Sequence, residues 1–312
     1  MHKNCVNDED RYGIHRYFDY LTVLFSLYSI FGRDRKNEVY QQILKGRGNM
    51  IKLFISDIDG TMMSHSGKIQ EEDVLAIQDL MNQNVGIAFA SGRLDNEIIE
   101  LMNNINGKFH RISINGVCVY THENKQLLSS QITPEILPEL LKITSGENYI
   151  RYVCDESNYY IEEKTTLIQQ IEKKIALASV EEPNLLNKVN KTIFPNKISI
   201  GGNKEEIIVL KDKLEQIFKG KISTFISAEQ VLDIMPAQIS KGAAISVLLE
   251  ELKLAPEEIA CIGDSYNDIP MFSLTPHSFA MSTANREVKQ HANYVVNSVK
   301  EAINQVIVYN TK

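Results

Sequence analysis

The sequence predicts an α/β protein whose core is a Rossmann-like, doubly wound parallel sheet interrupted by an inserted α+β segment. Three observations support this prediction. Short apolar runs alternate with amphipathic helical segments up to residue 114, helices then mix with more hairpin-like strand pairs from residue 134 to about residue 236, and the alternation resumes after Pro236. Alternation of strands and helices favours right-handed βαβ units, which build a parallel sheet.

The first block contains three predicted strands and the helices between them. Residues 51–56 form a short apolar run that is typical of a buried parallel strand. Residues 69–83 carry apolar side chains at helical spacing, with acidic side chains in the first turn, where they interact favourably with the helix dipole. Residues 85–90 and 112–114 are the next predicted strands, and residues 94–104 form the helix that joins them.

A hairpin over residues 117–120 and 126–130 marks the change of pattern. The segment that follows mixes strand pairs with helices: we predict strands at 149–154, 159–162, 222–227 and 231–235, and helices near 165–178 and 203–218. After Pro236 the βα pattern returns, with a helix over 240–252 and a buried strand over 259–263. We therefore expect a core domain of residues 50–131 and 236–312, with residues 132–235 as an inserted domain.

Length and charge restrict the class of protein. A chain of 312 residues is long enough for about two domains. Lysine and arginine number 33 against 40 aspartates and glutamates, a net charge of −7. This balance argues against nonspecific binding of nucleic acid, although a local cationic site can still bind an anionic small molecule.

The four cysteines are far apart in the sequence, which excludes a CxxC zinc or redox motif and a disulfide scaffold. We expect reduced thiols in a cytoplasmic protein, with Cys118 and Cys261 in the core because each lies within an apolar run. No segment reaches the roughly 18 consecutive apolar residues of a membrane span. We therefore expect no stable membrane association, and the sequence gives no indication of an oligomeric state.

Residues 1–49 differ from the rest of the chain, since they are rich in aromatic residues and become basic at residues 33–36. They could form an extra helix that packs on the domain or on a partner, or a weak membrane-surface element. They could also be absent from the protein, with the true start at Met50. We favour the third interpretation, because Met50 stands directly before the first element of a complete domain.

The first predicted strand ends in two carboxylates, Asp57 and Asp59, followed by Gly60 and Thr61. Ligands of open α/β sheets bind outside the carboxyl ends of the strands. The two carboxylates would point in similar directions if the strand geometry continued. A turn or a helix cap is the structural alternative for such a pair.

Two further strand-to-helix junctions carry polar groups. Ser91 follows the second strand. It can be a helix N-cap, or its hydroxyl can bind an anion, and the two interpretations are compatible. Lys241 begins a predicted helix, where its charge opposes the helix dipole. That conflict is expected if Lys241 balances a bound anion, whereas a solvated surface lysine is the alternative.

The strand over residues 259–263 ends in a third polar group, with Asp264, Asn267 and Asp268 following Gly263. Several oxygen-bearing side chains at a strand end suit a hard cation such as Mg²⁺. An acidic turn without a ligand is the alternative.

The four motifs together, DIDGT, ASGR, SKG and GDSYND in this order, resemble those of the haloacid dehalogenase (HAD) superfamily of phosphatases. The resemblance is greatest to the Cof-type branch, whose members carry a large α/β cap between the second and third motifs. The interval from Ser91 to Lys241 is long enough for the hairpin and such a cap. The resemblance covers residues 50–308 and excludes residues 1–49.

The resemblance implies a reaction and a set of roles. Asp57 would be the nucleophile that forms an aspartyl-phosphate, and Asp59 the general acid and then base. Mg²⁺ would be held by Asp57, the backbone carbonyl of Asp59 and Asp264, with Asp268 acting through water. The cation offsets the repulsion between a carboxylate and a phosphate dianion.

The resemblance also implies a phosphate-binding set: Ser91, Gly92, Lys241 and Asn267. Asn115 and Gly116, after the third strand, match a further family position that lines the site. The sequence departs from the family pattern at residues 281–284, which read Met-Ser-Thr-Ala where relatives carry Met-Gly-Asn-Ala, and an Asp-Gly-Val near the end is absent. These differences concern loops beside the site.

The expected activity is therefore that of a Mg²⁺-dependent phosphomonoesterase acting on small phosphorylated metabolites, with sugar phosphates as the expected substrates. A phosphomutase of the same superfamily is one alternative, and a non-catalytic protein that binds a phosphorylated ligand is another. The cap would close over the site and select the leaving group.

Overall fold

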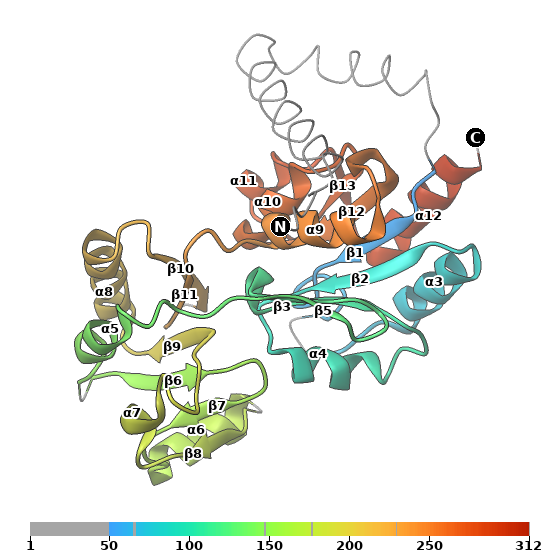
Figure 1. Cartoon of the computed structure of the whole chain (residues 1–312). Coiled ribbons are helices and arrows are strands. Elements are labelled where there is room, and N and C mark those ends of the chain that lie inside the picture. The colour runs from blue at the N-terminus through green and yellow to red at the C-terminus, as the bar shows by residue number, and fades with distance from the viewer. Residues whose placement is uncertain (1–49, 65–66, 147, 176, 229, 312) are drawn as a thin grey trace, which may run out of the picture. The chain divides into compact units, whose positions relative to one another are not determined.

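The computed structural model describes residues 50–312 apart from residues 65–66, 147, 176, 229 and 312 (Figure 1). Residues 50–312 form one compact unit. The predictions about the N-terminal 49 residues therefore lie outside the described residues. Within the described part, no helix is both long enough and apolar enough to cross a membrane.

Eight strands of the described chain form one sheet. They are Leu53–Ser56 (β1), Gly86–Ala90 (β2), His110–Ser113 (β3), Cys118–Tyr120 (β4), Gln126–Ser129 (β5), Ile259–Gly263 (β12), Ser278–Met281 (β13) and Tyr294–Val296 (β14). Their order is β14-β13-β12-β1-β2-β3-β4-β5, and the neighbours are parallel from β14 to β3, whereas the β3–β4 and β4–β5 pairs are antiparallel. This is the predicted doubly wound sheet.

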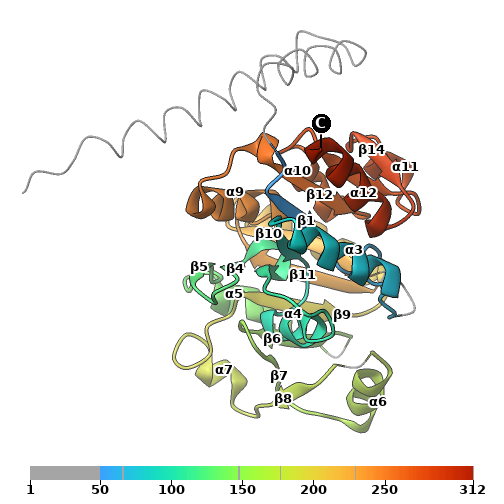
Figure 2. The same cartoon turned by 90° about the vertical axis from the view of Figure 1, so that its right-hand side faces the viewer.

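Helices cover both faces of this sheet. They are Glu71–Asn82 (α3), Asp95–Met102 (α4) and Val299–Asn310 (α12) on one face, and Lys241–Leu252 (α9), Ile269–Phe272 (α10) and Arg286–Lys289 (α11) on the other. The alternation of side chains along β1 explains the two layers, since Phe54 packs on the first face and Leu53 and Ile55 pack on the second. Figure 2 shows α3 and α12 side by side on their shared face.

The inserted segment forms a second, six-stranded sheet. Its strands are Ile150–Cys154 (β6), Tyr159–Ile161 (β7), Ser179–Glu181 (β8), Lys197–Gly201 (β9), Ile222–Ala228 (β10) and Val231–Pro236 (β11), and its helices are Leu137–Ile143 (α5), Thr166–Ile175 (α6), Leu185–Lys188 (α7) and Lys204–Ile217 (α8). The order is β10-β11-β9-β6-β7-β8, and only the β7–β8 pair is parallel. This α+β unit is the expected cap, while the exact domain boundaries stay predictions.

Apolar side chains join the two sheets. Leu94 and Ile114 of the core pack in one cluster with Tyr152, Cys154 and Met235 of the cap. Polar contacts lie beside this cluster: the side-chain amide of Asn96 donates to the carbonyl of Ser157 at 2.8 Å. The cap is therefore seated on the segments that follow β2 and β3.

One predicted element differs from the structure. We expected a strand over residues 112–114, but β3 ends at Ser113 and residues 114–116 form a 3-10 turn. Ile114 and Asn115 have positive φ angles of 52° and 56°. The chain reverses direction here to begin the antiparallel β4, and an extended Ile114 would not allow that reversal.

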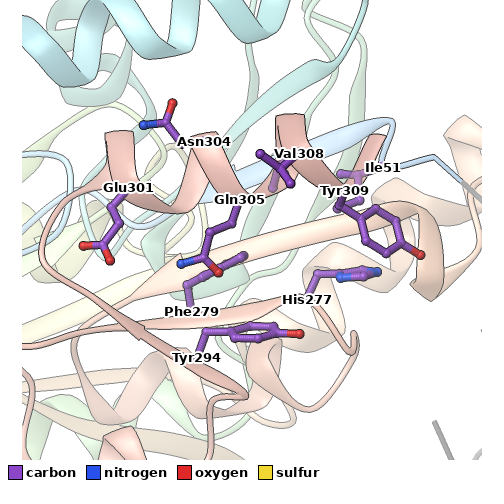
Figure 3. Close-up of a pocket in the computed structure, with 10 residues that line it drawn as sticks. Ile51, His277, Phe279, Tyr294, Glu301, Asn304, Gln305, Val308 and Tyr309 are labelled. Carbon is purple, nitrogen blue, oxygen red and sulfur yellow. The ribbon is translucent and has the colours of Figure 1, made fainter. Parts of the chain in front are cut away.

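A cavity of about 520 Å³ lies between α12 and the strands β13 and β14. Figure 3 shows His277 close to Tyr309, with Tyr294 and Phe279 on the side of the strands. His277 precedes β13 and Tyr294 begins β14, so the cavity is at the amino ends of these strands. The carboxyl ends of the parallel strands lie at the opposite edge.

Candidate active site

The polar groups predicted from the sequence lie at the carboxyl edge of the larger sheet. Asp57 directly follows β1, Ser91 follows β2, and Asp264 follows β12. Asn115 lies in the turn after β3, and Lys241 is the first residue of α9. Because β12, β1, β2 and β3 are adjacent and parallel, their carboxyl ends bring these residues to one edge.

Lys241 lies between two carboxylates and is fully buried. Its Nζ is 2.5 Å from Oδ1 of Asp57 and 2.6 Å from Oδ1 of Asp268. Ser240 caps the helix and accepts a hydrogen bond from the backbone of Ala243, so the start of α9 fixes the lysine. The prediction that Lys241 balances an anion is consistent with this placement, and the solvated-surface alternative is wrong.

Burial is the main influence on the acidity of Asp57, because removal from water disfavours its charged form. It raises the pKa of Asp57 above its ordinary value, although Lys241 acts in the opposite direction. Burial lowers the pKa of Lys241, but Asp268 and Asp57 outweigh this effect and raise the pKa above its ordinary value. Lys241 therefore remains a cation at neutral pH.

Three carboxylates at this edge can hold a metal ion. Asp57, Asp264 and Asp268 each offer one oxygen, and these oxygens lie within 4.8 Å of one another. Oδ2 of Asp57 is buried and has no hydrogen-bond partner among the described residues. A buried carboxylate oxygen without a partner is costly unless a cation binds it. This unpaired oxygen fits a divalent cation of the predicted kind.

Asp268 has a positioning role within this group. Its Oδ1 contacts Lys241, and its Oδ2 accepts hydrogen bonds from the backbone N–H groups of Asp264 and Ser265, both at 2.9 Å. Because both of its oxygens are engaged, Asp268 has less capacity to bind a cation directly than Asp57 has. The arrangement is compatible with the expectation that Asp268 reaches the metal through water.

Asp59 points away from this cluster. Its side chain is half exposed and forms a bidentate pair with Arg93, with Asp59 oxygens 2.8 Å from Nε and 2.7 Å from Nη2. We expected Asp57 and Asp59 to point in similar directions if the strand continued. β1 ends at Ser56, and Gly60 turns the chain at φ +89°, so the strand geometry does not continue.

Arg93 is the site residue that the sequence reasoning missed. It belongs to the same short motif as Ser91, but no role was assigned to it. The signal was present, since a basic residue directly follows the Ser91-Gly92 pair at a strand end. Its partner Asp59 is 34 residues away in sequence, and only the fold shows which carboxylate it contacts.

The predicted phosphate-binding residues lie around the strand ends. Ser91 is buried, and its Oγ accepts a hydrogen bond from the backbone of Arg93 at 3.2 Å. The N-cap interpretation of Ser91 is wrong, because α4 begins at Asp95 and its N-cap residue is Leu94. The hydroxyl therefore belongs to the strand end and not to the helix.

Two asparagines and a glycine complete this part of the site. The amide of Asn267 donates to Oδ1 of Asn115 at 2.9 Å, and Oδ1 of Asn267 is buried without a partner among the described residues. A Cβ at Gly92 would stand 3.3 Å from the Asn115 side chain, so the backbone approaches that amide closely. The predicted roles of Ser91, Gly92 and Asn267 stay predictions.

The three cysteines within the described residues agree with the expectation of reduced thiols. Cys118, Cys154 and Cys261 are buried and free. Burial raises the pKa of each thiol, which leaves them protonated and unreactive at neutral pH.

Comparisons with known proteins agree with this geometry. Residues 54–307 match the family model of haloacid dehalogenase-like hydrolases. The chain is 23% identical to the HMP-PP phosphatases of Serratia proteamaculans and of Klebsiella pneumoniae, in each case over 77% of this chain and 87% of the relative. A crystal structure of a haloacid dehalogenase-like hydrolase from Bacteroides thetaiotaomicron superposes with a TM-score of 0.75 at 26% identity, covering 82% of this chain and 99% of that one.

Proposed function

The chain belongs to the haloacid dehalogenase-like hydrolases, and we propose that it is a Mg²⁺-dependent phosphomonoesterase that works through an aspartyl-phosphate. One observation carries the proposal: Asp57 is buried at the carboxyl edge of the sheet, with one oxygen on Lys241 and the other unpaired beside Asp264 and Asp268. A nucleophilic carboxylate needs such an arrangement, with a fixed cation on one side and room for a metal ion on the other.

In the first step, an oxygen of Asp57 attacks the phosphorus, and the bond from phosphorus to the leaving-group oxygen breaks. Asp59 gives that oxygen a proton as the leaving group departs. In the second step, Asp59 takes a proton from water, the water oxygen attacks the phosphorus, and Asp57 leaves as a free carboxylate beside inorganic phosphate. Arg93 positions the Asp59 carboxylate through its bidentate contact.

Asp57, the backbone carbonyl of Asp59 and Asp264 would hold Mg²⁺, and Asp268 would act through water. When bound, the ion supplies positive charge that reduces repulsion between Asp57 and the phosphate. Lys241 holds Asp57 in place and contributes positive charge to the transferring group. Ser91, the backbone at Gly92 and Asn267 would bind the phosphate oxygens from the neighbouring strand ends.

We propose sugar phosphates and related small metabolites as the substrates, in a cytoplasmic setting. The relatives named HMP-PP phosphatases act, by their names, on a phosphorylated small molecule, which supports this class without specifying the compound. A phosphomutase would use the same first step but would return the phosphoryl group to the substrate.

The test is phosphate release from a panel of phosphorylated sugars, nucleotides and cofactors, with Mg²⁺ and with EDTA, for the wild-type protein and Asp57→Asn. We expect metal-dependent release that falls by at least about a thousandfold in the variant, because the nucleophile is lost. Isomerised substrate without free phosphate would indicate the mutase. Release that persists in Asp57→Asn would contradict the proposed nucleophile, and ligand binding without turnover would indicate a non-catalytic protein.

A further inference from the structure

One face of the cap sheet carries a group of polar side chains that the proposed reaction does not use. In the strand register, Ser199 of β9 pairs with Asp233 of β11, and Cys154 of β6 pairs with both Lys197 of β9 and Tyr159 of β7. Directly paired residues of neighbouring strands share a face, and so do residues two apart in one strand. We call Tyr159, Lys197, Ser199 and Asp233 the cap polar cluster.

This face of the cap sheet is directed toward the catalytic core. Helices α5, α7 and α8 cover the opposite face, and Figure 1 shows α5 and α8 on the side away from the larger sheet. On the cluster's own face, Cys154 packs with Leu94 and Ile114 of the core. Leu94 directly follows Arg93, and Ile114 directly precedes Asn115, so this face lies over two segments of the active site.

The cap polar cluster is also connected to the Asp59–Arg93 pair. The hydroxyl of Tyr159 donates to Oε2 of Glu97 at 3.1 Å, and Nζ of Lys197 lies 5.3 Å from the centre of the Tyr159 ring. Glu97 and Tyr159 are both near enough to Arg93 to contribute to its raised pKa, after the larger effect of Asp59. A single side chain, Tyr159, therefore separates Lys197 from the surroundings of the general acid.

The charges of the cluster are poorly matched for a purely structural role. The side chains of Lys197 and Asp233 are each only 5% exposed, yet Nζ and Oδ2 are 3.8 Å apart, which is longer than a hydrogen bond. The other Asp233 oxygen accepts from Ser199 at 2.5 Å. A buried ion pair lowers the stability of a protein unless its geometry is excellent. This pair places a donor and an acceptor near each other without a direct hydrogen bond between them.

We propose that the cap polar cluster binds the leaving group of the substrate and selects one that carries hydroxyl groups. Lys197 would donate to a hydroxyl oxygen, Asp233 would accept from a hydroxyl, and the ring of Tyr159 would contact the C–H face of the same group. A second anionic group is disfavoured because Asp233 carries a negative charge at the same place. This inference rests on the proposed phosphomonoesterase function and names the residues that choose among its substrates.

Lys197, Ser199 and Asp233 of the cluster are buried, so a substrate reaches them when the cap moves away from the core. Such movement is common in enzymes whose sites are closed by a lid. Polar contacts between cap and core on this side join Asn96 to Ser157 and Tyr159 to Glu97. Glu156 of the cap also accepts hydrogen bonds from Tyr120, Gln126 and Ser129 of the core hairpin. A substrate hydroxyl at Lys197 and Asp233 would then hold the closed arrangement.

The test compares two substrates in the full-length protein with saturating Mg²⁺. One is the best hexose phosphate of the panel, and the other is p-nitrophenyl phosphate, whose leaving group has no additional hydroxyl. For Lys197→Met we expect kcat/KM on the sugar phosphate to fall by about ten- to a hundredfold, the loss typical of a charge-assisted hydrogen bond to substrate, mainly through KM. On p-nitrophenyl phosphate we expect a change of less than about threefold. Asp233→Asn should likewise lower the ratio of kcat/KM on the sugar phosphate to kcat/KM on p-nitrophenyl phosphate.

Arg151→Met is the matched control. Arg151 is a partly buried cation on β6 that pairs with Glu162 at 2.7 Å, but it is adjacent to Tyr152 in the strand and therefore points to the other face. We expect Arg151→Met to leave the ratio of the two kcat/KM values unchanged. Ser199→Ala, which removes one hydroxyl, replaces Lys197→Met if that variant does not fold.

The outcomes separate the two proposals. An equal loss on both substrates, or no loss on either, would overturn the role of the cap polar cluster while leaving the phosphomonoesterase function intact. A wild-type protein that hydrolyses neither substrate, nor any other phosphomonoester, would overturn both. A larger loss on a bisphosphate than on a monophosphate would show that Lys197 binds an anion and would contradict the selection of hydroxyl groups.

Discussion

Each of the two sheets places a buried lysine beside aspartate, and the two lysines differ in how closely they are held. Lys241 of the larger sheet touches two carboxylates at 2.5 and 2.6 Å, and each of these carboxylates has a defined place at the strand ends. Lys197 of the cap sheet lies 3.8 Å from a single carboxylate, and that carboxylate is shared with Ser199. Tight pairing suits a group that must keep a nucleophile fixed, whereas loose pairing leaves room for a ligand.

This difference also reflects how the two regions are built. Lys241 is held by a capped helix start and by strands that converge on the edge of a parallel sheet. Lys197 lies on a strand with antiparallel neighbours on both sides, so the residues around it are set by strand register rather than by a common edge. The core therefore supplies chemistry from fixed strand ends, and the cap supplies a surface whose side chains can vary without disturbing that chemistry.

The largest expected effect on stability comes from replacing each lysine in turn, which tests whether Lys241 is paired more tightly than Lys197. Lys241→Met leaves Asp57 and Asp268 without their cation, and we expect the free energy of unfolding at pH 7 to fall by about 3–5 kcal/mol, as when a buried ion pair is broken. Lys197→Met leaves one carboxylate that still accepts from Ser199, and we expect a loss of about 1–2 kcal/mol. Urea unfolding of both variants measures the difference. Equal losses would contradict the view that only one lysine is tightly paired.

The two sheets also differ in how their stability responds to low pH, because the cap segment of residues 132–235 contains no histidine. His277 precedes β13 of the larger sheet, and burial lowers its pKa to about 4 from an ordinary 6.5. Between these pH values the unfolded chain holds the proton and the folded chain does not, so stability falls as the pH drops from about 6.5 to about 4. The contribution of the neutral His277 to stability is fully present above the pKa of the unfolded state.

The histidine contribution can be measured by comparing the wild-type protein with His277→Gln. We expect the wild-type protein to lose about 2–3 kcal/mol more than the variant between pH 7 and pH 4, which is the value of the pKa difference after allowance for partial exposure. Hydrogen exchange should place this loss in β13 and α12, where His277 lies against Tyr309, and not in the cap. Parallel pH profiles of the two proteins would refute a buried neutral His277.

The same contrast explains which parts of the site could be predicted. Asp57, Asp264 and Lys241 lie directly at the ends of strands or the start of a helix, and the polarity of the sheet brings such positions together whatever the loop details are. The direction of Asp59 could not be predicted in this way, because it depends on the turn at Gly60 and on the distant partner Arg93.

The cap polar cluster could not be predicted from the sequence, for a different reason. Lys197 and Asp233 lie in ordinary short strands, and the helix α8 and the strand β10 separate them in the chain. Their proximity follows from the register of β9 with β11, which places Ser199 opposite Asp233. Register depends on packing across the whole sheet, and a change of one residue would turn Lys197 to the other face. No local spacing encodes that outcome.

The smallest expected effect on stability comes from replacing a glycine in each region. The comparison tests whether the close packing at the carboxyl edge of the larger sheet is needed to hold a metal ion. Gly60 has φ +89°, and a Cβ there would lie 2.7 Å from the carboxylate carbon of Asp264. Gly220 of the cap has a similar φ of +72°, but a Cβ there would meet nothing within 4 Å. Replacing either glycine by alanine forces a left-handed backbone on a residue with a side chain, and this strain should cost about 1 kcal/mol. At Gly60 the overlap with Asp264 adds to that cost.

Only Gly60→Ala should also displace Asp264, and we expect it to raise the Mg²⁺ concentration for half-maximal phosphate release by at least about tenfold, the effect typical of disturbed metal ligation. Gly220→Ala should leave that concentration unchanged, since its strain is remote from the carboxylates. Titration of both variants with Mg²⁺ after EDTA treatment measures the difference. If the two variants needed the same Mg²⁺ concentration, Asp264 would not be a ligand held in place by Gly60. The loss of stability in Gly60→Ala would then come from backbone strain alone, as we expect for Gly220→Ala in the cap.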